Sequence, residues 1–342
     1  ATPKRSDAIF VLQPRLSLQS DFARHRVELY GGADLRRHAE ISAENSEAWD
    51  LGARALLEMA GWVNIRPEAR IARGIEQRGT AGDQFLSERP IAYTRKELLF
   101  GIAREQQRLE LGLNGRISRT DYSDTSLGGV PVDLSGRDNT YRSADLRVGY
   151  DLGSRIQVFA KLGGNRLTYQ LPAAQVRNSS GYSLLGGARI RVTSLFDFEV
   201  GTGYLRQNFS DPAFAPLTAM NYSLAMNWTP RPSWQIRAAA DRSVDPSPIA
   251  TAPAIFRTSY RLEAKHVVGT RVLLGGSLAH VRESYRAIPR TDRRYEADVS
   301  LTYRLTPNVG VIAGLGYRKQ DGGATGRTYD GVSAGLAVRV VG

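Results

Sequence analysis

The sequence predicts an all-β chain, a transmembrane antiparallel up-and-down β-barrel, from three observations. Apolar and polar residues alternate in about seventeen segments between residues 8 and 340, with almost no helical period. Many segments are about ten residues or longer, the length that a tilted strand needs to cross a bilayer. No run reaches the roughly eighteen apolar residues that a membrane-spanning helix requires.

The alternation keeps one phase from segment to segment. In 140–152, Leu146 and Val148 alternate with Asp145 and Arg147. Because successive strand residues point to opposite faces, each segment has one apolar and one polar face. A slip of one residue would exchange the faces, so the shared phase predicts a fixed register. Expected strands include, in chain order, 9–19, 63–77, 140–152, 156–165, 220–228, 234–243, 271–282, 295–305 and 329–340.

The connections between segments alternate in length, and this predicts the orientation of the barrel. Tight connections fall at 22–25, 151–154, 193–195, 229–233, 268–270 and 305–308. Longer polar loops fall at 79–90, 123–139, 171–178, 210–216, 245–253 and 287–294. Outer-membrane barrels have short periplasmic turns and longer external loops, so we assign the tight set to the periplasm of a Gram-negative cell.

Composition fits one barrel domain over residues 1–342 and excludes several alternatives. The chain has no cysteine, so it has no disulfide, thiolate metal site or thiol nucleophile. Its net charge is +12, but the arginines are spread at strand spacing rather than clustered in a patch. We therefore expect outer-membrane lipid and lipopolysaccharide as partners, and no nucleic acid.

The number of expected strands is odd, whereas bacterial single-chain barrels normally have an even number. By the loop assignment, segments 9–19 and 329–340 both run towards the periplasm. We expect a further strand before Ala1, giving about eighteen in the whole protein, with residues 1–7 as the remainder of an extracellular loop. The alternatives are a true seventeen-stranded sheet or an N-terminus that threads the lumen.

Aromatic residues near the expected strand ends predict a girdle at the membrane surface. Amphipathic rings prefer the level of the lipid headgroups. The alternative is ordinary strand aromatics packed in a soluble core. The expected girdle residues are Tyr150, Trp228, Trp234, Tyr303 and Tyr317.

Two segments interrupt the apolar face. In 63–77 the interruption is Arg73, and in 271–282 it is His280. Both residues fall on the face that should meet lipid, where a charged or polar side chain is tolerated close to an interface. We therefore expect Arg73 and His280 near the ends of the membrane span.

The polar face predicts a wet lumen of mixed charge. Expected lumen-lining bases are Arg15, Arg36, Arg54, Arg95, Arg116, Arg147, Lys161, Arg189, Arg191, Arg237, Arg257, Arg261, Arg304, Arg318 and Arg339. Expected lumen-lining acids are Glu58, Glu97, Asp145, Glu199, Asp241, Glu263, Glu296 and Asp298. Unpaired guanidinium groups would favour anions or acidic glycans. Lys265 and further acids, among them Asp34, Glu110, Asp151 and Asp197, share this face. Acids therefore nearly match bases, and cross-strand ion pairs that stiffen the wall are the favoured interpretation.

Enzymatic chemistry has little support in the sequence. The four histidines are scattered, so no pair shares a face at metal-ligand spacing. The only candidate for a hydrolase is His266 or His280 with Ser277 or Ser284. A histidine placed at the interface is the favoured alternative, and we expect neither catalytic residues nor a cofactor or metal.

Two stretches resemble signature segments of the family called Putative beta-barrel porin 2. They are 198–214 (FEVGTGYLRQNFSDPAF) and 13–25 (QPRLSLQSDFARH). In that family the first stretch precedes a strand ending in Trp-x-Pro, here 228–230, and then a Ser-Arg-Ser-like strand end, here 241–243. The resemblance extends over essentially the whole chain. The C-terminus departs from it, because 340–342 lacks the aromatic residue on which many barrels end.

The resemblance implies a porin-like outer-membrane channel, often encoded beside exopolysaccharide synthesis and export. It also implies a strand upstream of the segment that matches 9–19. We therefore expect a passive conduit for polar solutes or an exported exopolysaccharide, with polysaccharide-export or other envelope proteins as partners. The alternative is an occluded barrel that anchors or scaffolds a surface or periplasmic complex.

Overall fold

The computed structural model describes residues 6–59, 62–76, 78, 80, 87–322 and 328–342. Strands dominate this part of the chain. The first strands are β1 (Ile9–Leu12), β2 (Arg15–Gln19), β3 (His25–His38), β4 (Ser46–Met59), β5 (Val63–Ile75), β6 (Ala92–Gln106), β7 (Leu109–Tyr122), β8 (Thr125–Leu127), β9 (Val130–Val132) and β10 (Asn139–Asp151). The later strands are β11 (Ile156–Tyr169), β12 (Ser179–Thr193), β13 (Phe196–Phe209), β14 (Leu217–Trp228), β15 (Trp234–Pro246), β16 (Ala254–Val268), β17 (Val272–Tyr285), β18 (Thr291–Arg304), β19 (Val309–Asp321) and β20 (Tyr329–Val340).

The main sheet is a single antiparallel meander of eighteen strands. Each strand from β3 to β7 and from β10 to β20 pairs with its neighbours in the chain, while β8 and β9 form a separate hairpin. Strands β1 and β2 both pair with β3, through Ile9 opposite His38 and Arg15 opposite Gly32. They therefore share one position, so the sheet has the seventeen positions that the alternation predicts.

Pro14 explains the interruption between β1 and β2. Proline has no backbone N–H to donate to a ladder and is tolerated at the edge of a sheet. Its carbonyl still accepts a hydrogen bond from the N–H of Ala33, at 3.0 Å. The interrupted strand thus keeps its place beside β3.

The sheet has two edges, β1–β2 and β20. Both run in the same direction, from the end with long loops to the end with short turns. Within the described residues, no ladder pairs β20 with β1 or β2, because β20 pairs with β19, and β1 and β2 pair with β3. Residues 1–5 lie outside the described residues, and the expected strand before Ala1 stays a prediction. Asp7 accepts hydrogen bonds from the N–H groups of Glu40 and Ile41, which places it beside the connection from β3 to β4.

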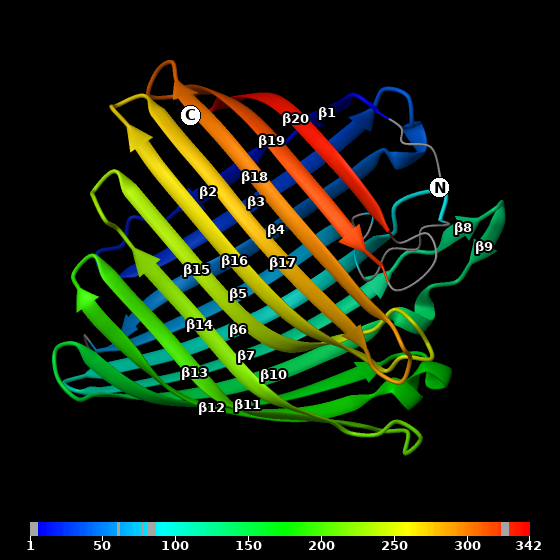
Figure 1. The fold of residues 1–342 in the computed structure, drawn as a ribbon, viewed down its shortest axis with the longest axis horizontal. Helices are drawn as coiled ribbons and strands as arrows, with labels where there is room; N and C mark the ends of the chain where they lie inside the picture. Colours follow the sequence, from blue (N-terminus) through cyan, green and yellow to red (C-terminus); the bar gives the residue numbers. More distant parts are fainter. Residues whose placement is uncertain (1–5, 60–61, 77, 79, 81–86, 323–327) are drawn as a thin grey trace.

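The sheet curls so that its early and late strands form opposite walls (Figure 1). The hydroxyl of Tyr329, at the start of β20, donates to the carbonyl of Arg78, just after β5, at 3.5 Å. Likewise Arg177, after β11, donates to the carbonyl of Ser247, after β15, at 3.1 Å. These contacts require the curvature of a barrel.

The connections separate by length to the two ends of the barrel, as the sequence predicts. The tight turns lie at one end of the barrel, and the longer segments lie at the other (Figure 1). The long loops include the hairpin β8–β9 and the short 3₁₀ helices η1 (Ser42–Glu44), η2 (Ser135–Arg137) and η3 (Pro172–Arg177). Two loops are shorter than expected, because β15 continues to Pro246 and β18 begins at Thr291. Most of the expected loop 79–90 lies outside the described residues.

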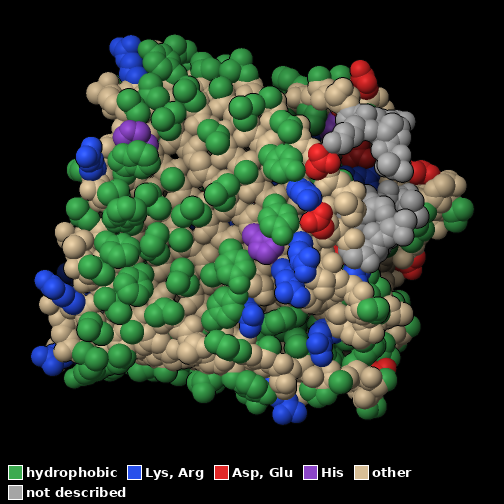
Figure 2. Space-filling model, in the orientation of Figure 1, with side chains coloured by type: hydrophobic (Ala, Val, Ile, Leu, Met, Phe, Trp, Pro, Cys, Tyr) green, Lys and Arg blue, Asp and Glu red, His purple; other side chains and the backbone are tan. Residues whose placement is uncertain are grey.

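Burial is inverted relative to a soluble protein. Gln157, Gln207 and Gln320 are buried, whereas Leu278 and Val299 are exposed at 55% and 63%. Hydrophobic side chains cover most of the outer wall of the strands nearest the viewer (Figure 2). Such a wall is stable where hydrocarbon surrounds it and polar groups face inward. The described part of the chain contains no helix long and apolar enough to cross a membrane.

One ladder is incomplete. Strands β14 and β15 pair only from Ser223 opposite Asp241 to Trp228 opposite Ile236. The loop-end half of β14 therefore lacks ladder partners on β15. The carbonyl of Met220 in this half accepts a hydrogen bond from Nη1 of Arg242, at 2.8 Å. A side chain thus partly replaces the missing backbone pairing.

Candidate lumen and its loop-covered mouth

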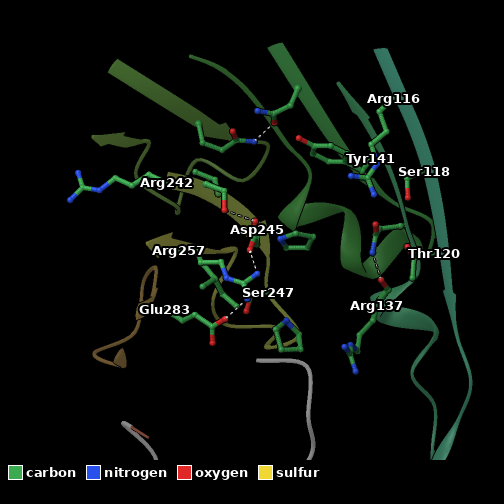
Figure 3. Close-up of a pocket in the computed structure, with 18 of the residues that line it drawn as sticks. Arg116, Ser118, Thr120, Arg137, Tyr141, Arg242, Asp245, Ser247, Arg257 and Glu283 are labelled. Atoms are coloured by element: carbon green, nitrogen blue, oxygen red, sulfur yellow. Dashed lines mark hydrogen bonds and ion pairs between the residues drawn. The ribbon is translucent and has the colours of Figure 1, made fainter. Parts of the chain in front are cut away.

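A cavity of about 630 Å³ lies inside the barrel at the end with the long loops. Its lining includes Arg95 of β6 and Arg116 of β7, together with Arg257 of β16 and Glu283 of β17. Strands distant in the sequence therefore surround one space. In Figure 3, Arg116 lies on the opposite side of this space from Arg257 and Glu283, while Arg242 points away from them.

A second cavity of about 380 Å³ lies further along the same strands. Ser183 and Asn221 line the first cavity, whereas Leu185 and Ser223 line the second. Ser183 and Leu185 are successive inward residues on β12, and Asn221 and Ser223 are successive inward residues on β14. The two cavities are therefore stacked along the wall of the lumen.

The second cavity is built around Arg147. Its guanidinium group pairs with Glu110 at 3.1 Å and with Glu199 at 2.8 Å. Arg189 shares Glu199 at 3.0 Å, and the ring of Phe159 lies 4.0 Å from the guanidinium carbon of Arg147. The network joins β7, β10, β11, β12 and β13. It fixes the wall by charge pairing and stacking.

Several other predicted lumen residues also form ion pairs. The pairs are Arg36–Asp34 at 2.9 Å, Arg257–Asp245 at 3.1 Å, Arg318–Glu296 at 3.1 Å, Lys161–Asp145 at 3.9 Å, and Arg116 with Glu97. Arg54 pairs with Glu28 at 2.8 Å. For these residues the structure supports ion pairs within the wall, so much of the inward basic charge is balanced.

The remaining predicted lumen residues lie on the same face by register, without such pairs among the described residues. The bases are Arg15, Arg95, Arg191, Arg237, Arg261, Arg304 and Arg339, and the acids are Glu58, Asp241, Glu263 and Asp298. Arg95 donates to the hydroxyl of Thr120 at 3.2 Å. Asp241 accepts from Ser259 and Asp298 from Ser277, each at 3.3 Å. Contact of this set with a solute stays a prediction.

Two buried arginines hold the long loops over the lumen. Arg137 of η2 pairs with Glu76, which follows β5, and stacks on the ring of Tyr122 at 4.0 Å. Burial opposes the charge on Arg137, but the neighbouring carboxylate of Glu76 raises its pKa above the usual value. Arg177 of η3 stacks on Tyr169 at 4.1 Å, besides its bond to the carbonyl of Ser247.

Small apolar clusters reinforce this cover. One consists of Leu167, Tyr169 and Ala174, where β11 meets η3. The other is centred on Ile255 and Tyr285. Sequence analysis did not identify these residues or the two buried arginines. The available signal was the break in alternation that inward apolar residues such as Tyr169 produce.

The histidine and serine candidates do not form a catalytic pair. His280 lies on the outer face, stacked on Tyr295 with ring centres 4.6 Å apart, whereas Ser277 faces inward and donates to Asp298. Ser284 shares the face of His280 but lies four residues along the strand, about 13 Å away. His266 stacks on Trp234 at 4.1 Å. Within the described residues, no group of three or more potential metal ligands occurs.

The aromatic residues expected in a girdle lie on the outer face. Tyr150, Trp228, Trp234 and Tyr303 lie near the short-turn ends of their strands, while Tyr317 lies towards the long loops. Trp228 also contacts Phe196 edge-on, at 6.3 Å between ring centres. Their contact with lipid headgroups stays a prediction.

An apolar outer wall, a polar interior and alternating turn lengths define an outer-membrane β-barrel. The chain belongs to the family described as Putative beta-barrel porin 2, whose model matches residues 1–341. This finding confirms the resemblance of segments 13–25 and 198–214. A search of curated protein sequences finds no match.

Solved structures show the same kind of fold at low sequence identity. The FrpB iron transporter from Neisseria meningitidis is 9% identical, with a TM-score of 0.57, over 96% of this chain and 66% of that chain. The ferric citrate transporter FecA is 12% identical, with a TM-score of 0.51, over 97% of this chain and 63% of that chain. The chain thus spans less than two thirds of the length of either transporter. At this identity the likeness concerns the fold alone.

Proposed function

We propose that the protein is a passive conduit for small polar solutes, with its long loops restricting the extracellular mouth. The stack of two polar-lined cavities inside the barrel carries this proposal. Barrels with sixteen to eighteen strands enclose more space than side chains fill, so water is expected in the lumen. Solutes would move along the inward faces of β7 and β10–β14.

The charges of the lumen favour weak ion selectivity. Glu110 and Glu199 balance the charges of Arg147 and Arg189 beside the second cavity, and Asp245 matches Arg257. Paired charges focus less field than isolated guanidinium groups do. An exported exopolysaccharide, the other solute class expected from the resemblance, would need the contacts of Arg137 and Arg177 to open.

The inward packing of the loops favours a second candidate, an occluded barrel that anchors a surface or periplasmic complex. Tyr169 is 1% exposed and Arg177 is 4% exposed, so the mouth is closely packed where η3 lies. A sealed barrel would use its external loops or periplasmic turns for contact with a partner. Ion conduction separates the two candidates.

The test is single-channel recording in planar bilayers, with wild-type protein and the double variant Arg137→Ala, Arg177→Ala. We expect a small wild-type conductance, a several-fold larger conductance for the variant, and a reversal potential near zero in a salt gradient. Arg231→Ala, in a short turn at the other end, is the control and should match wild type. If neither wild type nor the double variant conducts, the conduit is wrong and the anchoring barrel is favoured.

A further inference from the structure

Arginines project from the outer wall where the apolar surface ends. The outer basic belt consists of Arg142, Arg166, Arg206, Arg242, Arg282 and Arg293, each within five residues of the loop end of its strand. Each lies in phase with the apolar outward residues of its strand, such as Leu146 for Arg142. Figure 2 shows Lys and Arg side chains gathered between the hydrophobic wall and the loops.

The belt places like charges directly opposite one another. Arg142 is the cross-strand partner of Arg166, and Arg282 is the partner of Arg293. Directly opposed like charges on one face of a sheet destabilise it. Two such pairs at the same level of the barrel are therefore costly unless an anion lies between their guanidinium groups.

In the described ladders, the one acid directly opposite a belt arginine is Asp321, across from Arg293, and it pairs with Lys319 at 3.5 Å instead. Among the described residues, none of the six belt arginines has an ion pair with Asp or Glu, in contrast to Arg147 and Arg257 in the lumen. Arg206 donates only to the amide oxygen of Asn208, at 3.1 Å. Arg242 reaches a backbone carbonyl and stacks on Tyr222 at 4.3 Å.

Tyrosines mark the level of the belt relative to the bilayer. Tyr204 lies two residues from Arg206 on the same face of β13, and Tyr295 lies two residues from Arg293 on β18. In both strands the tyrosine is on the membrane side of the arginine. Tyrosine rings prefer the headgroup level, and arginine side chains extend their charged ends towards water. The guanidinium groups would therefore lie where lipid phosphates lie.

We propose that the outer basic belt binds the phosphate groups of glycolipid headgroups in the outer leaflet. Arginine binds phosphate with two parallel hydrogen bonds, so one phosphate can bridge the two guanidinium groups of an opposed pair. Bridging turns the repulsion within Arg142–Arg166 and Arg282–Arg293 into attraction. This binding is independent of whether the lumen conducts.

The first test measures thermal unfolding of the purified protein in an uncharged maltoside detergent, with and without added lipid. We expect lipid A to raise the unfolding temperature, and its dephosphorylated form to leave it unchanged. Phosphatidylglycerol and inorganic phosphate serve as comparison ligands. Equal effects of either comparison ligand, or of the dephosphorylated form, would overturn the assignment to a phosphorylated glycolipid.

The second test compares two double variants of equal charge change. Arg282→Ser with Arg293→Ser should weaken lipid A binding at least tenfold, measured by native mass spectrometry. Arg237→Ser with Arg261→Ser, on the inward face, should bind like wild type. Unchanged binding by the belt variant would rule out the proposal.

Unfolding without lipid distinguishes a lost site from a damaged fold. Removal of the opposed charges should leave the belt variant as stable as wild type or more stable, because repulsion is relieved. With lipid A, wild type should be more stable than the belt variant, because the variant has lost the arginines that bind the phosphates. A variant that is less stable in both conditions has a damaged fold, and Arg142→Ser with Arg166→Ser then provides the second variant for the same comparison. If lipid A stabilises both belt variants, Arg282→Ser with Arg293→Ser and Arg142→Ser with Arg166→Ser, as much as wild type, the proposal fails.

Discussion

At the scale of single residues, Arg147 shows how a charge in the lumen wall is held. Its guanidinium group pairs with carboxylates on β7 and β13 and covers the ring of Phe159. Its side chain is 16% exposed, whereas that of Arg54, which pairs with Glu28, is 55% exposed. Water screens the exposed pair and leaves it with little net energy.

We predict that Arg147→Ala lowers the free energy of unfolding by about 2 kcal/mol, because Glu110 and Glu199 lose charged hydrogen-bond partners. Arg54→Ala should cost less than about 1 kcal/mol. Denaturant unfolding in detergent, followed by tryptophan fluorescence, measures both. Equal losses in the free energy of unfolding for the two variants would show that burial does not determine how much these ion pairs stabilise the fold.

The sequence predicted which residues share the inward face but not which ones meet. Alternation alone places Arg147 and Glu199 on one face, because the period of a strand is two. Their pairing depends on register across β11 and β12 and on the reach of the arginine, neither of which alternation contains. The buried Arg137 and Arg177 were missed because loops have no period from which burial can be inferred.

At the scale of elements, β14 and β15 share a shorter ladder than any other two neighbouring long strands of the described sheet. Their ladder ends at Ser223, whereas β17 and β18 pair from Val272 to Ser284. The alternation of apolar and polar residues did not reveal this difference, because both strands alternate normally. The alternation within a strand shows which of its residues share a face. It does not show how far that strand pairs with its neighbour.

We predict faster amide hydrogen exchange in 217–222 and 242–245 than in the corresponding ends of β17 and β18. Backbone groups without ladder partners open with a lower free energy. Arg242→Ala should increase exchange further around Met220, because it removes the hydrogen bond to that carbonyl. Mass spectrometry of peptic fragments provides the measurement. Equal protection of the two regions would contradict the incomplete ladder.

At the scale of the whole molecule, the sequence predicted the class, the number of strand positions and the separation of short turns from long loops. It could do so because lipid outside and water inside impose one pattern on every strand. The edges β1–β2 and β20 run in the same direction, so one strand antiparallel to both could pair with each of them. Unpaired backbone groups in hydrocarbon cost several kcal/mol each.

We therefore predict that the 342-residue chain associates through its edges in mild detergent. The chain has no cysteine, so single cysteine variants report contacts between copies. Leu336→Cys on β20 should form disulfide-linked dimers on mild oxidation, whereas Leu278→Cys in the middle of the sheet should not. A Leu336→Cys chain that stays monomeric on oxidation would contradict association through the edges.

The hairpin β8–β9 extends beyond the rest of the mouth (Figure 1), and the Ser126 hydroxyl and the Gly129 N–H donate to the carboxylate of Glu88. Its turn contains Gly128 and Gly129, both with positive φ, and nothing lies within 4 Å of a Cβ built on either. The hairpin is thus held to one neighbouring segment, whereas η2 and η3 hold the buried cover of the mouth through Arg137 and Arg177, so a change in η2 or η3 would disturb distant loops. Sequence drift under pressure from antibodies or phage should therefore concentrate at this hairpin, and an epitope inserted there would label intact cells without altering the passage beneath it.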